Sequence, residues 1–326
     1  MKTLQSKIKK LLWATIQLYG LGITIYTILH YTIDERFIVV AWLNNGAYLL
    51  WAGAMVLIVP CIIFRRQRTL AIMAIPALAL IFNYLPMYFP RDIHQPSNTE
   101  QLTVLTYNIN IAPPDPQGIV NDIRKIDADI VAIQELTFGT VDVLERELAT
   151  QYPYRALHPV HGFHGQGILS KYPIVSDEFW NIYLGHQRAG VDIDGTVVNV
   201  YNVHPVHHIL PFWGFDISRR TEEVMVFLNK SKQDSTPVLI MGDLNMTDQA
   251  EDYQHITSTY QDSYRQVGYG MGTTFPAHIP FLPSLVRIDY VFHSDGFTAL
   301  TADVLRSTGG SDHRPLVVTL ALDQAQ

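Results

Sequence analysis

The sequence predicts a layered α/β domain preceded by an all-α transmembrane region of three helices. Three observations lead to this fold class. The first 92 residues contain long apolar runs without any Asp, Glu, Lys or Arg. From residue 102 onward, shorter apolar runs of strand length recur. Segments with helical periodicity lie between these shorter runs, and strands mixed with covering helices are typical of domains built from packed layers.

The N-terminal apolar runs are long enough to cross a bilayer. They cover residues 11–33, 37–64 and 69–89. A membrane-spanning helix needs about 20 apolar residues, and a helix of a soluble core rarely stays apolar for that length. Because Asn44 and Asn45 interrupt the second run, we place its span at about 44–64, with the apolar part beginning near Ala47. A cleaved signal peptide is disfavoured, since its apolar region is only ~7–15 residues long.

Basic residues predict the orientation of this anchor. They precede the first span or lie between the second and third spans: Lys2, Lys7, Lys9, Lys10, Arg65, Arg66 and Arg68. The loop between the first two spans carries a single basic residue, Arg36. By the positive-inside rule, the N-terminus is therefore cytoplasmic. Three spans then place the rest of the chain beyond the cell (inner) membrane, in the periplasm or outside the cell.

The charge balance supports a division into an anchor, a linker and a domain. We assign residues 1–92 to the anchor, 93–101 to a Pro-bearing linker and 102–322 to the α/β domain. Residues 1–92 carry nine Lys and Arg against three Asp and Glu, whereas residues 93–326 carry fourteen against twenty-seven. The second part therefore has a net charge of −13. Such a domain repels a polyanion unless bound cations reverse the field locally.

Apolar runs outline the strands of the α/β domain. They lie at 102–107, 130–133, 166–170, 197–203, 237–241, 288–292 and 315–321. Several are nearly continuous in Val, Ile and Leu, as is typical of strands that are buried on both faces. Helices are predicted at 117–126, 139–150 and 216–230. The single cysteine, Cys61, excludes a disulfide framework and a cysteine-based zinc site.

Polar side chains follow several of these runs at the point where each strand ends. Asn108, Glu135, His204 and Asp243 occupy such positions. Asn and Asp also form ordinary turns, and a histidine before Pro205 can simply end a strand. A carboxylate at the end of a buried strand, however, is unfavourable unless it is paired or bound to a metal. Together these strand ends predict a metal-assisted hydrolytic site.

Residues further along the chain extend this set. Asn245 lies two positions after Asp243, so strand alternation would point both side chains in the same direction. Asp312 and His313 follow a glycine-rich turn and precede the last strand. Asp289 lies within a predicted strand, where a histidine partner would stabilise its carboxylate.

Taken in order with the segment GQGILSKYP, these motifs resemble the endonuclease/exonuclease/phosphatase superfamily. Its members include pancreatic-type deoxyribonuclease, exonuclease III-like repair enzymes, inositol polyphosphate 5-phosphatases and neutral sphingomyelinases. The resemblance covers about residues 102–322 and implies a four-layer αββα sandwich with the site at one rim. The three-span region before it resembles the membrane-anchored bacterial subgroup.

The resemblance also implies a role for each residue. Phosphoester hydrolysis needs a polarised phosphate, an activated water and a stabilised leaving oxygen, and a hard divalent cation supplies the first and third. The expected cofactor is Mg²⁺, or alternatively Mn²⁺, held by Glu135, Asn108 and Asp312. The expected catalytic residues are His313, oriented by Asp289; Asp243, which acts on water; and Asn245 and His204, which donate to the phosphate or, for His204, to the leaving group.

Two apolar loops beside the predicted catalytic residues bear on the substrate. They cover residues 207–215 and 277–286. The loops either pack against each other or enter the lipid interface, as apolar loops do in sphingomyelinase-like relatives. We therefore expect a phosphodiester or phosphomonoester substrate close to the membrane, such as a lipid head group.

Two other functions remain open at this point. A nuclease acting on extracytoplasmic DNA or RNA fits the family, but the net charge of −13 and the absence of a Lys/Arg cluster in the domain disfavour it. A membrane-anchored adaptor without catalytic activity is disfavoured because the chain keeps Glu135, Asp243, Asp312 and His313.

Overall fold

The computed structural model describes residues 2–89, 99–207, 217–279 and 281–323. The chain forms two compact units. One contains residues 1–89 with 249–251, and the other contains residues 90–248 and 252–326. Each unit is built differently, the first from helices alone and the second around two sheets.

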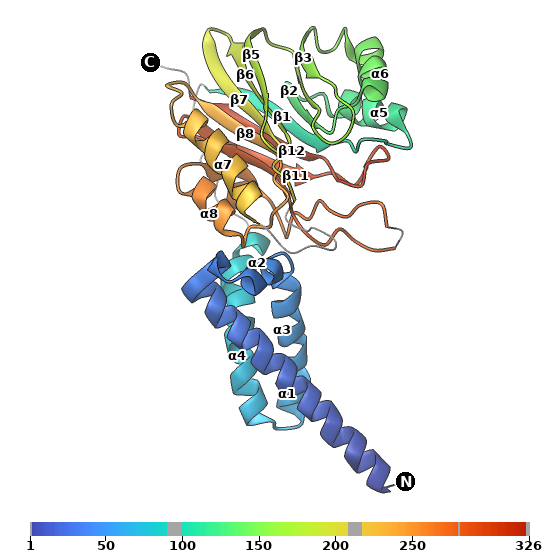
Figure 1. Cartoon of the computed structure of the whole chain (residues 1–326), viewed down its shortest axis with the longest axis vertical. Coiled ribbons are helices and arrows are strands. Elements are labelled where there is room, and N and C mark those ends of the chain that lie inside the picture. Colours follow the sequence, from blue (N-terminus) through green and yellow to red (C-terminus); the bar gives the residue numbers. More distant parts are fainter. Residues whose placement is uncertain (1, 90–98, 208–216, 280, 324–326) are drawn as a thin grey trace. The chain divides into compact units, whose positions relative to one another are not determined.

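The N-terminal unit consists of helices joined by short turns (Figure 1). They are α1 (Lys2–Ile33), η1 (Asp34–Arg36), α2 (Ile38–Asn44), α3 (Ala47–Ile63), α4 (Gln67–Tyr84) and η2 (Leu85–Tyr88). α1 with η1 and α4 with η2 are each long and apolar enough to cross a membrane. α2 and α3 meet at a bend of 76° and add a third span if the pair is counted as one. Two or three of these helices therefore have the properties expected of membrane spans.

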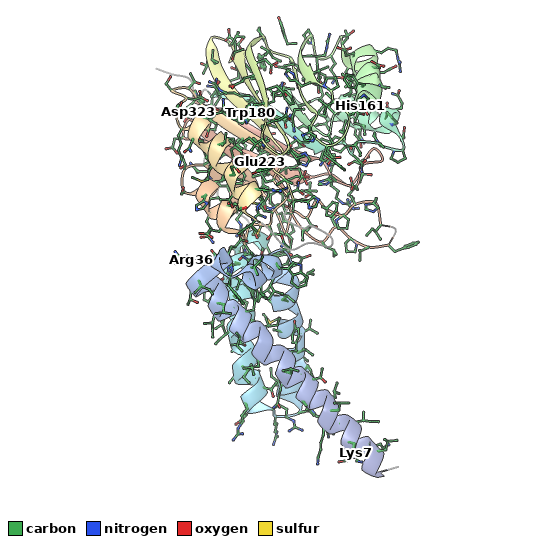
Figure 2. All side chains as sticks on the ribbon, in the orientation of Figure 1. Lys7, Arg36, His161, Trp180, Glu223 and Asp323 are labelled. Carbon is green, nitrogen blue, oxygen red and sulfur yellow. The ribbon has the colours of Figure 1, made fainter. Side chains whose placement is uncertain are left out.

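Much of the surface of this unit is apolar. Some long charged side chains also project from it, such as Lys7 on α1 (Figure 2). Leu18 on α1 and Phe82 on α4 are largely exposed, whereas the small side chains of Ala54 and Cys61 are buried. Exposed large apolar side chains around a tightly packed centre are the arrangement expected for helices in lipid. α3 begins at Ala47, where the two asparagines of the sequence predicted that its apolar part would begin.

The second unit contains two six-stranded sheets. The first has the order β11-β12-β1-β2-β4-β3, with β1 (Glu100–Asn108), β2 (Ile130–Gln134), β3 (Tyr154–His158), β4 (Gln166–Ser170), β11 (Phe297–Val304) and β12 (Leu316–Leu322). The second has the order β5-β6-β7-β8-β10-β9, with β5 (Ile174–Asn181), β6 (Gly185–Ile193), β7 (Thr196–Val203), β8 (Val238–Asp243), β9 (Gln261–Asp262) and β10 (Asp289–His293). β1 and β2 run parallel, as do β7 and β8, and all other neighbours are antiparallel.

The two sheets face each other, and helices pack on the domain's outer sides. β1 and β2 contact β7, β8 and β10 across the interface between the sheets. α5 (Pro116–Ile126) and α6 (Phe138–Leu148), drawn in green in Figure 1, pack on the first sheet through a continuous apolar cluster. α7 (Ser218–Ser231) contacts β7 of the second sheet, and α8 (Glu251–Thr257) and α9 (Ser263–Val267) follow it. The predicted α/β architecture is confirmed as a sandwich of two mixed sheets.

All the strands predicted from apolar runs are present, but the sequence did not reveal several others. β3, β5, β6, β9 and β11 were missed because they are antiparallel strands without a long apolar run, and most residues of β5 are exposed. β1 begins at Glu100, two residues before the predicted start of the α/β domain. Residues 93–98 of the predicted linker and residue 216 of the third predicted helix lie outside the described residues.

Candidate active site

The strand topology brings the predicted residues to one end of the sandwich. Asn108 pairs with Gln134 in the parallel β1–β2 ladder, so Glu135 emerges beside Asn108. In the parallel β7–β8 ladder Val203 pairs with Gly242, and the next residues are His204 and Asp243. Because the carboxyl ends of parallel strands meet at the same edge, each sheet contributes two polar side chains to this end.

Antiparallel neighbours bring the remaining residues to the same end. β10 begins with Asp289, which pairs directly with Asp243 at the end of β8. β12 is antiparallel to β1, with Leu316 opposite Thr106, so the segment before β12 reaches the end of β1. That segment carries Asp312 and His313.

Asn108 connects the two sheets. Its Nδ2 donates to Glu135 Oε1 and to Asp243 Oδ2, each at 3.0 Å. Its Oδ1 accepts the backbone N–H of Asn110 at 3.0 Å. The amide therefore separates two carboxylates that would otherwise repel each other. Asn108 thus orders the site, and the second lone pair of its Oδ1 leaves it able to serve as the predicted metal ligand as well.

His313 and Asp289 form a buried pair. Nδ1 of His313 lies 3.0 Å from Oδ2 of Asp289, and Phe275 packs on the imidazole with ring centroids 4.9 Å apart. The backbone N–H of His313 donates to Ser311 Oγ, whose hydroxyl donates to the carbonyl of Asn108. The predicted pairing of His313 with Asp289 is present. It directs Nε2 of the ring toward the centre of the site.

Asp243 lies between two imidazoles. Its Oδ2 is 3.6 Å from Nε2 of His313 and 3.6 Å from Nε2 of His204. Nε2 of His204 is also 3.8 Å from Oε1 of Glu135. These distances are longer than hydrogen bonds, so the carboxylates and imidazoles form a close cluster without direct hydrogen bonds between them.

The surroundings of His313 and Asp243 change the pKa of each group by different causes. Burial opposes charge on His313, but Asp289 and then Asp243 outweigh it and raise the pKa of His313 to about 10. Burial raises the pKa of Asp243, an effect that His313 partly opposes. A carboxylate with a raised pKa is a stronger base than an ordinary one, and a charged imidazole is a strong donor to phosphate.

Asn245 is not part of the strand, contrary to the prediction from alternation. β8 ends at Asp243, and the backbone N–H of Asn245 donates to Asp243 Oδ1 within a turn. Asn245 has a φ of 51°, a left-handed conformation that asparagine tolerates better than most residues. Its Nδ2 donates to the carbonyl of Pro205, which places this amide beside the segment that carries His204.

Asp312 is linked to the site through Asn110, which was not among the predicted site residues. Its Oδ1 accepts from Nδ2 of Asn110 at 3.0 Å, and Asn110 follows Asn108 by two positions. Asn110 and Glu135 also have left-handed backbones, with φ values of 64° and 62°. This conformation is unusual for glutamate, and such strain is concentrated at functional sites. The second asparagine of the NIN motif was the available signal for Asn110.

Comparison with known proteins identifies the family. A sequence profile described as the Endonuclease/Exonuclease/phosphatase family matches residues 105–313. The chain belongs to this family. The match includes every predicted site residue from Asn108 to His313. A search of curated proteins finds no match.

Solved structures of the endonuclease/exonuclease/phosphatase family share the fold. A family protein from Bacteroides thetaiotaomicron has a TM-score of 0.59 at 21% identity, covering 70% of this chain and 100% of its own. A mannosyl-6-phosphatase from the same organism has a TM-score of 0.56 at 20% identity, covering 68% and 100%. A humanized D. rerio TDP2 has a TM-score of 0.56 at 17% identity, covering 68% and 98%. Members of the family are typically hydrolases of phosphoester bonds, and they typically use divalent metals.

The site offers two places where a divalent ion would fit. Glu135 accepts from Asn108 and from the backbone N–H of Ile111, which leaves lone pairs on both oxygens, and its side chain is partly exposed. Carboxylate and carbonyl oxygens are the ligands that Mg²⁺ prefers. Among the residues that the structure describes, one group of metal-ligand type has all its ligand atoms within 4.8 Å of one another, namely Asp243, Asp289 and His313. Glu135 is the more open position, because Asp289 is fully buried and already bound to His313.

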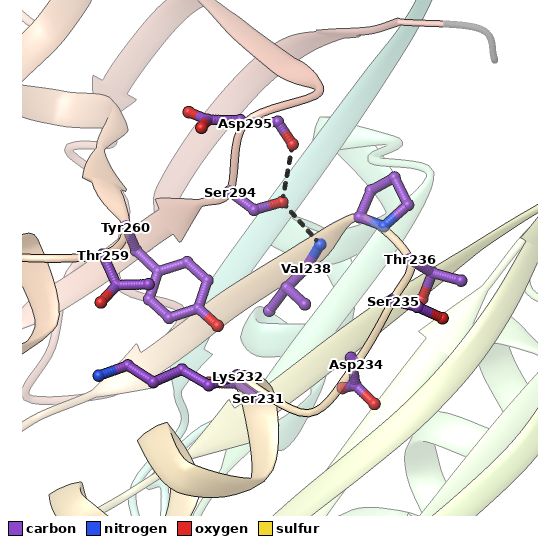
Figure 3. A pocket seen from close by; sticks show the side chains of 11 residues that line it. Ser231, Lys232, Asp234, Ser235, Thr236, Val238, Thr259, Tyr260, Ser294 and Asp295 are labelled. Atoms are coloured by element: carbon purple, nitrogen blue, oxygen red, sulfur yellow. Dashed lines mark hydrogen bonds between the residues drawn. The ribbon is translucent and has the colours of Figure 1, made fainter.

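A polar depression at the opposite end of β8 lacks comparable chemistry (Figure 3). It has a volume of about 450 Å³ and is lined by residues that include Lys232, Tyr260 and Ser294. The carboxylate of Asp234 forms an ion pair with Arg188 and accepts from the hydroxyl of Tyr201 at 2.7 Å. The lining residues include a second carboxylate, Asp295, but no histidine, so this depression lacks the imidazole–carboxylate arrangement found around Asp243.

Proposed function

We propose that the protein is a membrane-anchored, divalent-metal-dependent phosphoesterase that acts outside the cytoplasm. Its substrate is a phosphodiester, or a phosphomonoester, close to the membrane, and a lipid head group is the favoured class. The observation that carries the proposal is the cluster of Glu135, Asp243 and the imidazoles of His204 and His313 at the strand ends of both sheets.

The residues of this cluster support a sequence of hydrolytic steps. Asp243 takes a proton from the attacking water, the new phosphorus–oxygen bond forms and the ester bond breaks on the opposite side of phosphorus. The leaving oxygen receives a proton from His313 or His204, the two imidazoles that face Asp243. Asn245 steadies the segment bearing His204 through Pro205 and would donate its second amide hydrogen to a phosphate oxygen.

Metal binding fits this arrangement. Glu135 would hold the ion, with Asp312 and Asn108 shaping its surroundings through Asn110. A bound Mg²⁺ or Mn²⁺ supplies polarisation of the phosphate and stabilises negative charge on the leaving oxygen.

Membrane anchoring is supported by the apolar N-terminal helices. Their exposed leucines, isoleucines and phenylalanines are unfavourable in water and suit hydrocarbon. The basic residues at the N-terminus and at 65–68 favour a cytoplasmic location for both. With three spans, the hydrolase domain lies on the other side.

Labelling of introduced cysteines tests this orientation. In a Cys61→Ser background, Val175→Cys lies in the hydrolase domain and Arg68→Cys lies between the last two predicted spans, and both positions are exposed. We expect a membrane-impermeant maleimide to label Val175→Cys in intact spheroplasts and Arg68→Cys only after lysis. The reverse pattern would place the domain in the cytoplasm.

An apolar loop supports a lipid substrate. Phe281 is fully exposed, and Ile279 and Leu282 on either side are partly exposed. The base of this loop is joined to the catalytic segment, because the N–H of Ala277 donates to the carbonyl of Asp312 at 2.7 Å. Exposed apolar side chains at the tip of such a loop are suited to entering a lipid interface. The other predicted apolar loop, at 207–215, lies outside the described residues except for residue 207.

A comparison of substrates tests the proposed function. Purified full-length protein in detergent or nanodiscs, with Mg²⁺, is assayed on bis(p-nitrophenyl) phosphate, p-nitrophenyl phosphate, plasmid DNA and phospholipid vesicles. We expect metal-dependent hydrolysis of the generic diester and of lipid head groups. Nicking of DNA without lipid turnover would replace the lipid substrate by nucleic acid. No hydrolysis of any substrate would favour the adaptor.

The exposed loop gives a prediction with a matched control. Burying a phenylalanine contributes about 1.5–3 kcal/mol, so Phe281→Ser is expected to lower activity on vesicles by about 10- to 100-fold. Activity on bis(p-nitrophenyl) phosphate should stay unchanged, because Phe281 lies at the exposed tip of the loop. Val175→Ser, which removes an exposed apolar side chain from β5, should affect neither assay. Equal losses on both substrates would contradict a role at the lipid interface.

A further inference from the structure

A buried imidazole–carboxylate pair lies next to the segment that carries His204. Glu223 on α7 and His186 on β6 are both completely buried, and Nε2 of His186 lies 3.3 Å from Oε1 of Glu223. Glu223 is labelled on α7 in Figure 2. Taking a carboxylate and an imidazole out of water is unfavourable unless each group is satisfied by specific partners. Neither residue was among the predicted site residues. The sequence pattern of β6 or of α7 alone does not indicate that the two side chains meet.

Glu223 holds two separate backbone segments. Its Oε1 accepts from the N–H groups of Tyr183 at 2.9 Å and Leu184 at 2.6 Å, in the turn between β5 and β6. Its Oε2 accepts from the N–H of Val206 at 2.6 Å. A carboxylate has enough lone pairs to accept all three hydrogens, and the ionised form is an acceptor only. The three contacts therefore fix the turn and the segment after His204 to α7.

His186 binds the same segment at His204, two residues before Val206. Its Nδ1 accepts from the backbone N–H of His204 at 3.4 Å. This contact requires a lone pair on Nδ1 and leaves the ring hydrogen on Nε2, toward Glu223, although the Nε2–Oε1 contact is not a well-aligned hydrogen bond. Burial lowers the pKa of His186, which favours the neutral ring that this contact needs.

Side chains thus bind a backbone group of each of three successive residues. His204 is bound at its N–H by His186, Pro205 at its carbonyl by Asn245, and Val206 at its N–H by Glu223. The side chain of His204 is fixed in addition by the carbonyl of Phe163, which lies 3.3 Å from Nδ1. The N–H groups of His204 and Val206 are bound by the fully buried side chains of His186 and Glu223, whereas Nε2 of His204 faces the carboxylates of Glu135 and Asp243.

We propose that His186 and Glu223 are positioning residues, which set the place of His204 and, through Pro205, of Asn245. Their polar contacts run to each other and to backbone N–H groups, and not to Glu135, Asp243 or His313. The inference rests on the proposed hydrolysis at this site. Catalytic geometry must be held within about 0.5 Å, and a misplacement of 1 Å lowers rates by about 10²-fold.

The variants are chosen to separate positioning from folding. His186→Phe fills the space but removes the acceptor for the His204 N–H, whereas the side-chain oxygen of His186→Asn can take the place of Nδ1. Glu223→Gln keeps an acceptor oxygen but removes the charge and adds a donor. Glu222→Gln is the matched control, because Glu222 is the neighbouring residue on α7 and its carboxylate accepts from the exposed hydroxyl of Tyr183.

Kinetics on bis(p-nitrophenyl) phosphate give the first test. We expect His186→Phe to lower kcat by about 10- to 10²-fold with a smaller change in KM, and His186→Asn to recover most of the loss. In a His204→Ala background, His186→Phe should lower kcat much less than in the wild type, because only the effect through Asn245 remains. Multiplicative losses in that background, or equal loss in His186→Asn and His186→Phe, would overturn the inference.

Hydrogen exchange of the peptide around 203–207 gives a second test that does not depend on activity. We expect faster exchange in His186→Phe and Glu223→Gln at an unchanged rate for β2, and no change in Glu222→Gln. If the wild type hydrolyses no phosphoester but these rates rise, the proposed function fails while the positioning contacts stand. Unchanged exchange in both variants would show that the pair does not position this segment.

Discussion

Replacing Glu135 by glutamine is expected to lower kcat on a generic diester by about 10³-fold, because a bound divalent ion contributes several kcal/mol of charge stabilisation. Glu135 presents its carboxylate at the open side of the site, next to Asn108 and 3.8 Å from His204. Glutamine has the same shape but binds a hard cation weakly. The loss should therefore be accompanied by weaker Mn²⁺ or Mg²⁺ binding in titration calorimetry.

Glu135→Gln should leave the protein folded, with a Tm equal to or above that of the wild type. Its carboxylate and that of Asp243 share the Nδ2 group of Asn108, so neutralising one removes repulsion between them. Residues that serve function at the expense of stability commonly show this pattern. Glu145→Gln, an exposed change on α6, is the control and should alter neither kcat nor metal affinity.

The same titration distinguishes the two places for the ion. If the ion is held by Asp243, Asp289 and His313, metal affinity should survive Glu135→Gln and be lost in Asp243→Asn. If Glu135 is the principal ligand, the first substitution removes binding and the second lowers activity more than affinity. Wild-type kcat and affinity in Glu135→Gln would remove Glu135 from the site.

The residues at the ends of the parallel strands were predictable because two local signals coincide. β1, β2, β7 and β8 are nearly continuous apolar runs, and a polar residue ends or follows each one. Parallel order places such ends at the same edge of a sheet. What the sequence left open was the link between sheets, which depends on Asn108 reaching Asp243 across the sandwich.

The contacts of His186 and Glu223 were not predictable, because neither residue follows a continuous apolar run. His186 lies in β6, a strand with glycine, glutamine and arginine among its residues, and Glu223 lies on a helix with several charged residues. Their pairing follows only from packing α7 against the second sheet. The turn at Asn245 was misjudged because strand alternation was extended past Asp243, where β8 ends.

His313→Gln is expected to lower kcat by about 10²- to 10⁴-fold, the usual contribution of a positioned proton donor or acceptor. Nδ1 of His313 is bound to Asp289, so Nε2 is the nitrogen that addresses the substrate, 3.6 Å from Asp243. The substitution also leaves two buried carboxylates without a cationic partner. Breaking a buried pair costs about 3–5 kcal/mol, so the variant should also unfold at a lower temperature.

Asp289→Asn separates the catalytic effect from the structural one. Because Asp289 acts through His313, its replacement should lower kcat by about 10- to 10²-fold in the wild-type background and have no further effect in His313→Gln. Stability should behave differently. The double variant replaces a buried ion pair by two amides that can bond each other, so its Tm should exceed that of His313→Gln. A kcat cycle in which the two losses multiply would mean that Asp289 contributes to hydrolysis independently of His313, as it would if it were a metal ligand in its own right.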